Sequence, residues 1–343
     1  MARRKNGARG GDAAPGRRRR RPLRLVLAAL LVLAVVAAGL YWLRDQKLLT
    51  PEGCSVKTPA GEGTLEVPQA ANAATIAAVA HARGLPDRAV TISLATAMQE
   101  SKIRNLTGGD RDSVGLFQQR PSQGWGTVEQ IQDPVYATNK FLDGLVKVPG
   151  YTRLPLTDAA QQVQKSGYPQ AYAKHETKAT LLASALTGRE PASFSCVVHD
   201  FTAPETDDAS APAAASAPAA APATDAASPA ARPDRAQVLG DRVRREFGRT
   251  VTPATGYSSS VKGAENAVSL TPDPAASTDA GPDAERQNGW AVAHWAVAQA
   301  QQLGIETVAY DGKIWRRAKS ENGWKPQPTG TSTKLVLVSL TGS

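Results

Sequence analysis

Residues 95–119, ATAMQESKIRNLTGGDRDSVGLFQQ, decide how the fold is interpreted. They continue an apolar segment in which Val90, Leu94 and Ala97 share one helical face, and Glu100 stands at its end. Gly, Asp, Ser and Pro dominate the next segment, so 104–127 is predicted to be a loop or short hairpin. A carboxyl between a hydrophobic helix and a cleft loop is a setting where desolvation raises the pKa, as a general acid for glycoside cleavage requires. Glu100 is therefore the candidate catalytic residue.

Helical signals surround this stretch. Helices are predicted over Ala70 to Arg83, from Pro86 onward, from Asp133-Pro134 to about Val146, from Thr157-Asp158, and from Pro169 to near Gly188. Residues 52–200 are therefore expected to form one mainly α domain, with a short β or loop region and a core of its own.

Glu100-Ser101, followed by Ser113, Gly115, Leu116, Phe117 and Gln118, resembles two sequence blocks of the soluble lytic transglycosylases, in the lysozyme-like superfamily. Those blocks are Glu-Ser and Gly-Leu-Met-Gln. Asp133-Pro134 and the helix after it resemble the third block of that family, and 164–172 stand in the place of the fourth. The resemblance covers roughly residues 70–188 and implies a lysozyme-like fold.

The resemblance implies cleavage of the bond between N-acetylmuramic acid and N-acetylglucosamine in peptidoglycan. Glu100 would protonate the glycosidic oxygen and then act as base on the muramyl 6-hydroxyl, which leaves a 1,6-anhydro product. No metal or other cofactor is required. The residues expected to bind the glycan are Ser113, Gly115, Gln118, Trp125, Tyr168 and Tyr172. Trp125 is equally compatible with a core position, and the two tyrosines with packing at a helix entry.

Two alternatives remain open. Asp110 or Asp112, if about 6.5–9.5 Å from Glu100, would activate water as in an inverting hydrolase (a muramidase), although both also suit turn positions. Two departures from the family pattern, Ala137 in place of an Asn and Ser166-Gly-Tyr-Pro169 in place of Tyr-Asn-Ala-Gly, allow a non-catalytic glycan-binding or scaffold protein instead.

The two cysteines, Cys54 and Cys196, bracket the expected domain. Two cysteines exclude a disulfide-dense scaffold and a zinc ribbon. A bridge between them is predicted, worth about 5 kcal/mol by loop-closure entropy. The alternative is two unrelated free thiols.

The net positive charge of the chain is concentrated at the N-terminus. Residues 1–24 hold ten basic side chains and one acid, which equals the net charge of +9 of the whole chain. The apolar run 25–43 is expected to span a membrane once, with the N-terminus cytoplasmic, the bulk of the chain extracytoplasmic, and the arginines on anionic lipid headgroups. A cleaved signal peptide is the rival. Nucleic acid is not an expected partner, because the rest of the chain carries no net charge.

The C-terminal region is expected to consist of three parts. Residues 201–236 are an Ala/Pro-rich linker, and 237–289 are partly disordered around a helix at 238–247. Residues 290–343 form a small α+β module with a hairpin at Asp311-Gly312. Trp290, Trp295, Trp315 and Trp324 would form its core, or else bind a protein partner in a secretion or division complex.

Overall fold

The computed structural model describes most of the chain. The described residues are 21–45, 50–199, 234–262, 264, 266–276 and 283–341. Residues 1–20 of the expected basic tail and 201–233 of the expected linker lie outside these ranges. The chain forms two units, residues 1–50 and residues 51–343.

In the first unit, the described residues 21–45 form a helix, α1 (Arg21–Asp45). Within the described ranges, no helix has the length and apolar character required to cross a membrane. The membrane span expected over 25–43, and the single-pass location built on it, are therefore not supported.

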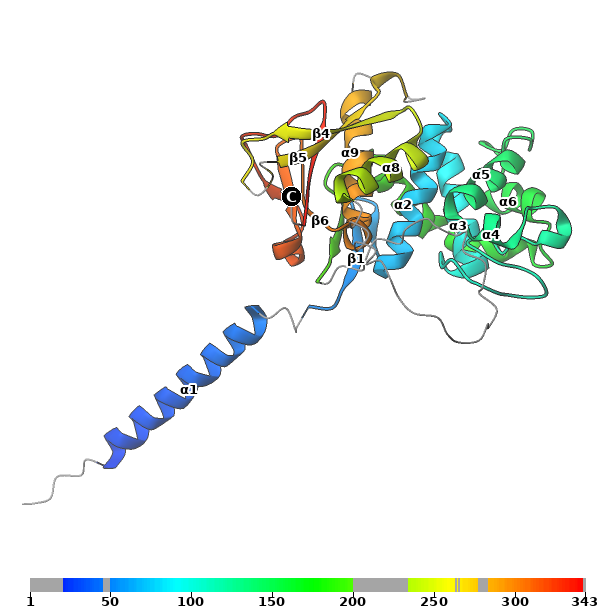
Figure 1. Cartoon of the computed structure of the whole chain (residues 1–343). Coiled ribbons are helices and arrows are strands. Elements are labelled where there is room, and N and C mark those ends of the chain that lie inside the picture. The colour runs from blue at the N-terminus through cyan, green and yellow to red at the C-terminus, as the bar shows by residue number, and fades with distance from the viewer. Residues whose placement is uncertain are drawn as a thin grey trace, which may run out of the picture. The chain divides into compact units, whose positions relative to one another are not determined.

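The second unit begins with a helical part around α2 (Figure 1). Its helices are α2 (Val67–Ala82), α3 (Asp87–Ser101), η1 (Pro121–Gln123), α4 (Val128–Gln132), α5 (Pro134–Leu145), α6 (Leu156–Gln164), η2 (Pro169–His175) and α7 (Glu176–Leu186). Asp133 caps α5 through its side chain, as the sequence predicts, and accepts a 2.9 Å hydrogen bond from the Val135 amide. The region 104–127 is mostly loop, with two isolated β-bridges.

A three-stranded antiparallel sheet closes the helical part, in the order β2-β1-β3. Its strands are β1 (Gly53–Thr58), β2 (Gly61–Leu65) and β3 (Phe194–Val197). Cys54 pairs with Cys196 across β1 and β3, and the two form the predicted disulfide. The bridge therefore joins the two ends of the segment that the sequence brackets.

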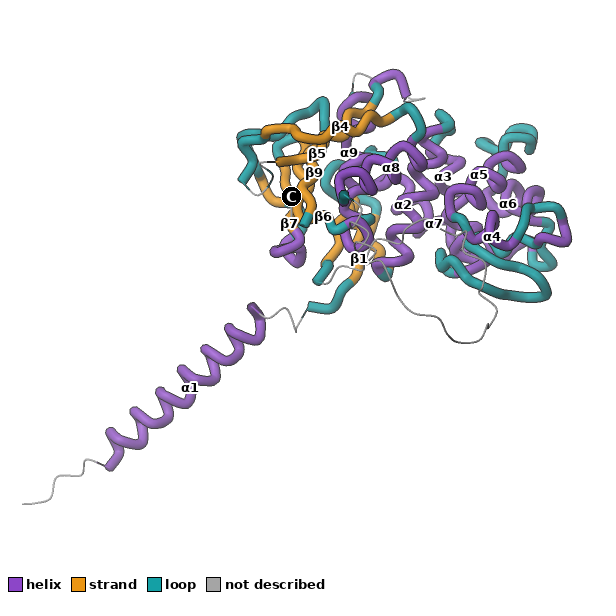
Figure 2. The backbone as a smooth tube through the Cα atoms, viewed as in Figure 1, coloured by secondary structure: helices purple, strands orange, loops and turns teal. Residues whose placement is uncertain are grey.

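The C-terminal part is built on a six-stranded antiparallel sheet, in the order β4-β5-β9-β6-β7-β8 (Figure 2). Its elements are α8 (Arg235–Phe247), β4 (Val251–Ser258), β5 (Asn266–Pro272), η3 (Pro274–Ala276), α9 (Ala284–Ala298), α10 (Ala300–Leu303), β6 (Ile305–Tyr310), β7 (Lys313–Arg316), η4 (Arg317–Asn322), β8 (Lys325–Pro326) and β9 (Val336–Leu340). Asp311 and Gly312 have positive φ angles and make the predicted hairpin turn between β6 and β7.

Each face of this sheet is covered, as the alternation of side chains along a strand requires. Val268, Leu270, Val336 and Val338 belong to the main core, to which α9 also contributes. Ala267, Ala309, Ile314 and Leu337 face the other way and form a small second core with Val261 and Ala264.

The two parts share one hydrophobic core. It extends from Val56 and Ile76 through Trp290 and Trp295 to Trp315. Two indole nitrogens cap the outer edge of β3: Trp315 donates to the Cys196 carbonyl at 3.1 Å and Trp324 to that of Phe194 at 2.8 Å. The interpretation of the four tryptophans as core residues is confirmed, since Trp290, Trp295 and Trp315 are at most 1% exposed and Trp324 packs against the same core.

The chain passes very close to itself at the seam. A Cβ atom on Gly188, just after α7, would lie 1.9 Å from the Gln287 carbonyl oxygen of α9. Gly188 also has a φ of 77°, so a larger residue there would be both strained and obstructed.

The expected fold class is therefore wrong. A mainly α lysozyme-like domain with a separate small module over 290–343 was expected, but residues 51–343 form one compact unit with two antiparallel sheets. Residues 237–289 were expected to be partly disordered around one helix, and their described residues hold most of α8, β4, β5, η3 and the start of α9. The prediction failed because β5 pairs with β9, a strand that comes much later in the sequence.

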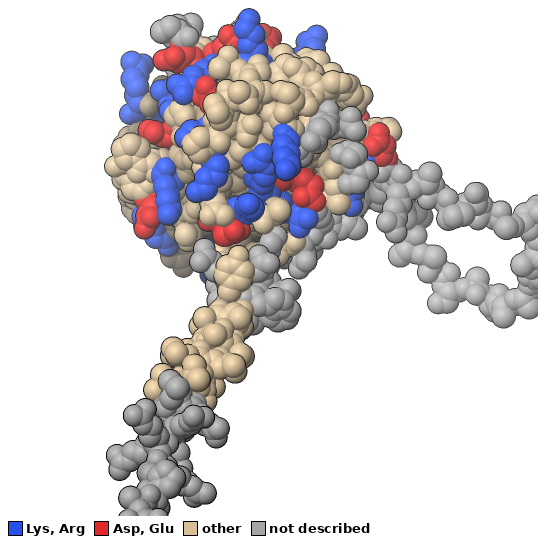
Figure 3. Space-filling view, turned by 90° about the vertical axis from the view of Figure 1, so that its left-hand side faces the viewer, with Lys and Arg blue, Asp and Glu red and all other residues tan. Residues whose placement is uncertain are grey.

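The surface agrees with the charge arithmetic. Residues 25–343 carry thirty basic and thirty acidic side chains. On the face shown in Figure 3, Lys and Arg side chains lie among Asp and Glu side chains.

Candidate functional site

Glu100 lies in the last turn of α3, a helix whose residues from Ala89 to Met98 are all buried. The helix ends at Lys102, which adopts the left-handed conformation (φ 58°). Glu100 itself is half-buried. The hydroxyl of Tyr172 donates a hydrogen bond to its Oε1 atom at 2.7 Å. The structure thus brings together two residues of the predicted site that are far apart in sequence.

Tyr172 lies on η2 and is fully buried. Burial, followed by the charge of Glu100 and the hydrogen bond to it, raises the pKa of Tyr172 above its ordinary range. The phenol therefore keeps its proton at neutral pH and acts as a fixed donor to the carboxylate. Because it is buried, Tyr172 fixes Glu100 rather than offering a face to a sugar ring.

Ser101 ties the end of α3 to the glycine-containing loop. Its buried hydroxyl lies 2.7 Å from the Leu116 carbonyl and 3.1 Å from that of Ala97. Gly115 packs directly against α4, since a Cβ there would lie 2.6 Å from the Ile131 carbonyl oxygen. Gly115 is therefore required by close packing against α4.

Leu116 and Phe117, in the loop of the candidate site, pack into the hydrophobic core. Both residues are fully buried, and the Phe117 ring stacks on Phe141 at 4.7 Å. Gln164, from the region of the predicted fourth block, donates to the Phe117 carbonyl at 2.8 Å. Leu116 and Phe117 are therefore core residues rather than residues that face a substrate.

Ser113 and Gln118 belong to the same loop but differ in exposure. Ser113 is buried, whereas Gln118 is half-buried and donates to the Gly115 carbonyl at 3.3 Å. Gln118 also packs against Gly109, where a Cβ would lie 1.7 Å from its Oε1 atom. Of these two candidates, Gln118 has the greater access to a ligand.

Asp112 has partners at both carboxylate oxygens. Arg120 Nε lies 2.6 Å from Oδ1, and the Ser122 amide lies 2.8 Å from Oδ2. Hydrogen bonds from Ser122 and then Arg120 hold the pKa of Asp112 well below its usual range. This arrangement suits a residue that fixes its own loop. Asp110 is exposed, and its carbonyl accepts from the Ser113 amide at 3.1 Å.

The remaining aromatic candidates differ sharply. Trp125 is half-buried and packs against the core, and its carbonyl accepts from the Tyr136 hydroxyl at 3.2 Å. Tyr168 is 79% exposed and lies at the start of η2, the element that carries Tyr172. Tyr168 is therefore the aromatic side chain of the predicted site that is free to stack on a ligand.

Some residues near Glu100 were missed at the level of sequence. Ser166 interacts with the Tyr172 hydroxyl and accepts from the Tyr168 amide at 3.2 Å. His175 is half-buried and lies 3.2 Å from Gln99, next to Glu100. No local pattern predicts these contacts, since they depend on the approach of η2 to α3. Within the described ranges, no three His, Cys, Asp or Glu side chains lie close enough to hold a metal ion.

The family that matches this chain covers a region outside the candidate site. Residues 230–334 match the family described as VldE, C-terminal domain. The match covers the C-terminal part up to the segment before β9 and includes none of the candidate site residues. No curated protein matches the chain.

Proposed function

We propose that this protein acts on the glycan strands of peptidoglycan and cleaves them with Glu100 as the single acid and base. The observation that carries the proposal is the 2.7 Å hydrogen bond from Tyr172 to Glu100, at the end of a buried helix and beside the loop that holds Gln118. Tyr168, the exposed residue just before the element that carries Tyr172, suits stacking on a sugar ring. The disulfide supports the proposal, because disulfides persist in oxidising compartments.

In the proposed reaction, the proton of Glu100 moves to the glycosidic oxygen as the bond from that oxygen to the muramyl C1 breaks. The glutamate then takes the proton of the muramyl 6-hydroxyl, whose oxygen forms the new bond to C1. The proton returns to Glu100 and no water is consumed. The contacts of both Asp112 oxygens with Arg120 and Ser122 count against Asp112 as the second acid of an inverting hydrolysis.

A second candidate is a glycan-binding protein without turnover. The observation that favours it lies on α5, where Ala137 stands at a position that is Asn in the resembled family. Ala137 is fully buried and has no polar side chain to offer a substrate.

Labelled peptidoglycan separates the two candidates. Wild-type protein and Glu100→Gln are compared for binding to the insoluble wall and for release of soluble label. Release by wild type and not by the variant supports the enzyme. Equal binding without release by either supports the binding protein. The full-length chain is needed, because residues 52–200 alone would expose the face of α2 that packs on α8 and α9 and the edge of β3.

A further inference from the structure

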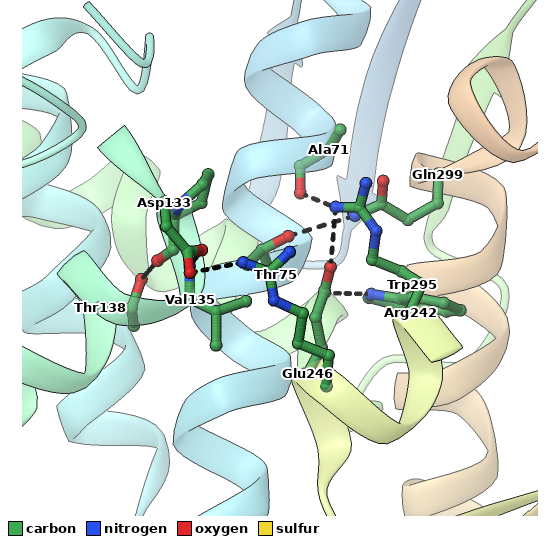
Figure 4. Close-up of polar contacts among 11 residues, drawn as sticks. Ala71, Thr75, Asp133, Val135, Thr138, Arg242, Glu246, Trp295 and Gln299 are labelled. Atoms are coloured by element: carbon green, nitrogen blue, oxygen red, sulfur yellow. Dashed lines mark hydrogen bonds and ion pairs between the residues drawn. The ribbon is translucent and has the colours of Figure 1, made fainter. Parts of the chain in front are cut away.

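The contact between α8 and the helical part has a polar centre (Figure 4). Glu246, on α8, is fully buried, and its carboxylate accepts from the Trp295 indole at 2.7 Å and from Arg242 at 3.4 Å. Gln299 donates to the Ala71 carbonyl and to the Thr75 hydroxyl of α2, each at 3.2 Å. Buried polar groups with directional partners fix the register of α8 and the α9–α10 segment against α2.

Arg245, next to Glu246, reaches away from this centre. Its guanidinium forms an ion pair with Oδ2 of Asp133. The other oxygen of Asp133, Oδ1, caps α5 through the Val135 amide. The C-terminal part therefore contacts the corner between α4 and α5 through Asp133, the residue that caps the N-terminus of α5. Both side chains are about a third exposed, so the pair is partly screened.

The residues just before Asp133 contact the loop of the candidate site. The Gln132 carbonyl accepts from the Asn105 side chain at 2.6 Å. The Ile131 carbonyl abuts Gly115, and Ser101 then ties Leu116 to the turn of α3 that carries Glu100. An unbroken series of contacts thus runs from the α4–α5 corner to Glu100.

We infer that Arg245 is a positioning residue for the candidate site, and that the C-terminal part holds the loop 104–119 in place through Asp133. Arg245 has no contact with substrate in this role. It acts by fixing the corner against which Asn105 and Gly115 pack. The activity part of this inference rests on the proposed function, whereas the ordering of the loop does not.

Hydrogen exchange of residues 104–119 in the full-length chain tests the ordering. Arg245→Gln removes the ion pair. Asp133→Asn removes it too but keeps a side-chain oxygen that caps α5. Both are expected to raise exchange in 104–119 about 2- to 30-fold, the range for coupling through contiguous contacts. Arg245→Lys, which keeps the charge, is expected to restore part of the protection.

Arg244→Gln is the matched control, because Arg244 pairs with Asp241 on the exposed side of the same helix. It is expected to leave the loop unchanged. On peptidoglycan, Arg245→Gln is expected to lower kcat by the same factor with little change in KM. Unchanged exchange in both Arg245→Gln and Asp133→Asn would overturn the inference. If Arg245→Gln does not fold, the exchange of residues 104–119 in Asp133→Asn and Arg245→Lys tests the inference instead. An inactive wild type would reject the proposed enzyme, and the exchange result would still decide the inference.

Discussion

Glu100 in the helical part and Glu246 in the C-terminal part lie in contrasting environments. Glu100 lies half-buried at the end of α3, with one hydrogen bond from Tyr172. Glu246 is fully buried and accepts from Arg242 and Trp295, and burial raises its pKa. A carboxylate that is oriented but accessible is suited to chemistry, whereas one enclosed by partners is suited to holding parts together. Under the proposed function, Glu100 has the chemical role, whereas the partners of Glu246 give it a structural role.

The disulfide is expected to have the largest effect on stability, because it closes the segment between β1 and β3. Cys54→Ala combined with Cys196→Ala should lower the free energy of unfolding by about 5 kcal/mol, since the two residues are 142 apart in sequence. One shared core predicts that both parts still unfold in a single denaturant transition. Two separate transitions would show instead that the parts are independent, and a loss below about 1 kcal/mol would contradict the stabilisation expected from loop closure.

His294 provides the next largest effect, in the C-terminal part. Burial lowers its pKa from 6.5 to about 4, and its Nδ1 lies 2.7 Å from the Ala185 carbonyl of α7. The unfolded chain binds this proton more readily, so the stabilisation is complete above pH 6.5 and is lost as pH falls toward 4. The loss amounts to about 3 kcal/mol.

His294→Asn keeps a donor for Ala185 but does not titrate, so its unfolding free energy should lack this pH dependence. Glu246 works in the opposite direction, because its raised pKa makes its contribution less favourable as pH rises. Denaturant unfolding at several pH values should therefore be compared as the difference between wild type and variant. A difference that does not change between pH 6.5 and 4 would contradict the burial of a neutral His294.

Tyr172→Phe should have a small effect on stability and a clear effect on the site. Loss of the hydroxyl should lower the free energy of unfolding by about 1 kcal/mol. It should also lower turnover on peptidoglycan about tenfold, because the Glu100 carboxylate loses its fixed orientation. Tyr257→Phe is the control, since Tyr257 is an exposed tyrosine on β4, outside the candidate site. Equal turnover in Tyr172→Phe and wild type would remove the proposed role of the phenol.

Local signals predicted local structure well. The Asp133 cap and the Asp311-Gly312 turn appear as expected. The Cys54–Cys196 bridge, which joins distant residues, was predicted because the chain holds just two cysteines and they bracket the expected domain. The large sheet was missed because β4 is largely exposed and β5 is completed by β9, so neither strand is marked by its own residues. Short β structure was expected in 104–127, whereas the sheet of the helical part comes from residues 53–65 and 194–197.

The candidate site shows the same limit. Glu100 and the loop could be found from their spacing, and Tyr172 was a candidate, but its contact with Glu100 joins residues 72 positions apart. Gly115 and Ser113 were expected to face the glycan, yet Gly115 packs on α4 and Ser113 is buried. Residue type alone does not distinguish a glycine needed for a ligand from one needed for a neighbouring carbonyl.

Mass analysis of muropeptides tests the proposed cleavage by Glu100 most directly. Purified peptidoglycan is incubated with the full-length chain, with Glu100→Gln, and with Glu62→Gln as an exposed glutamate control. We expect 1,6-anhydro ends from wild type and from the control, and a drop of about 10²- to 10⁴-fold in Glu100→Gln. Products with reducing ends, undiminished products from Glu100→Gln, or no products from wild type would contradict the proposal.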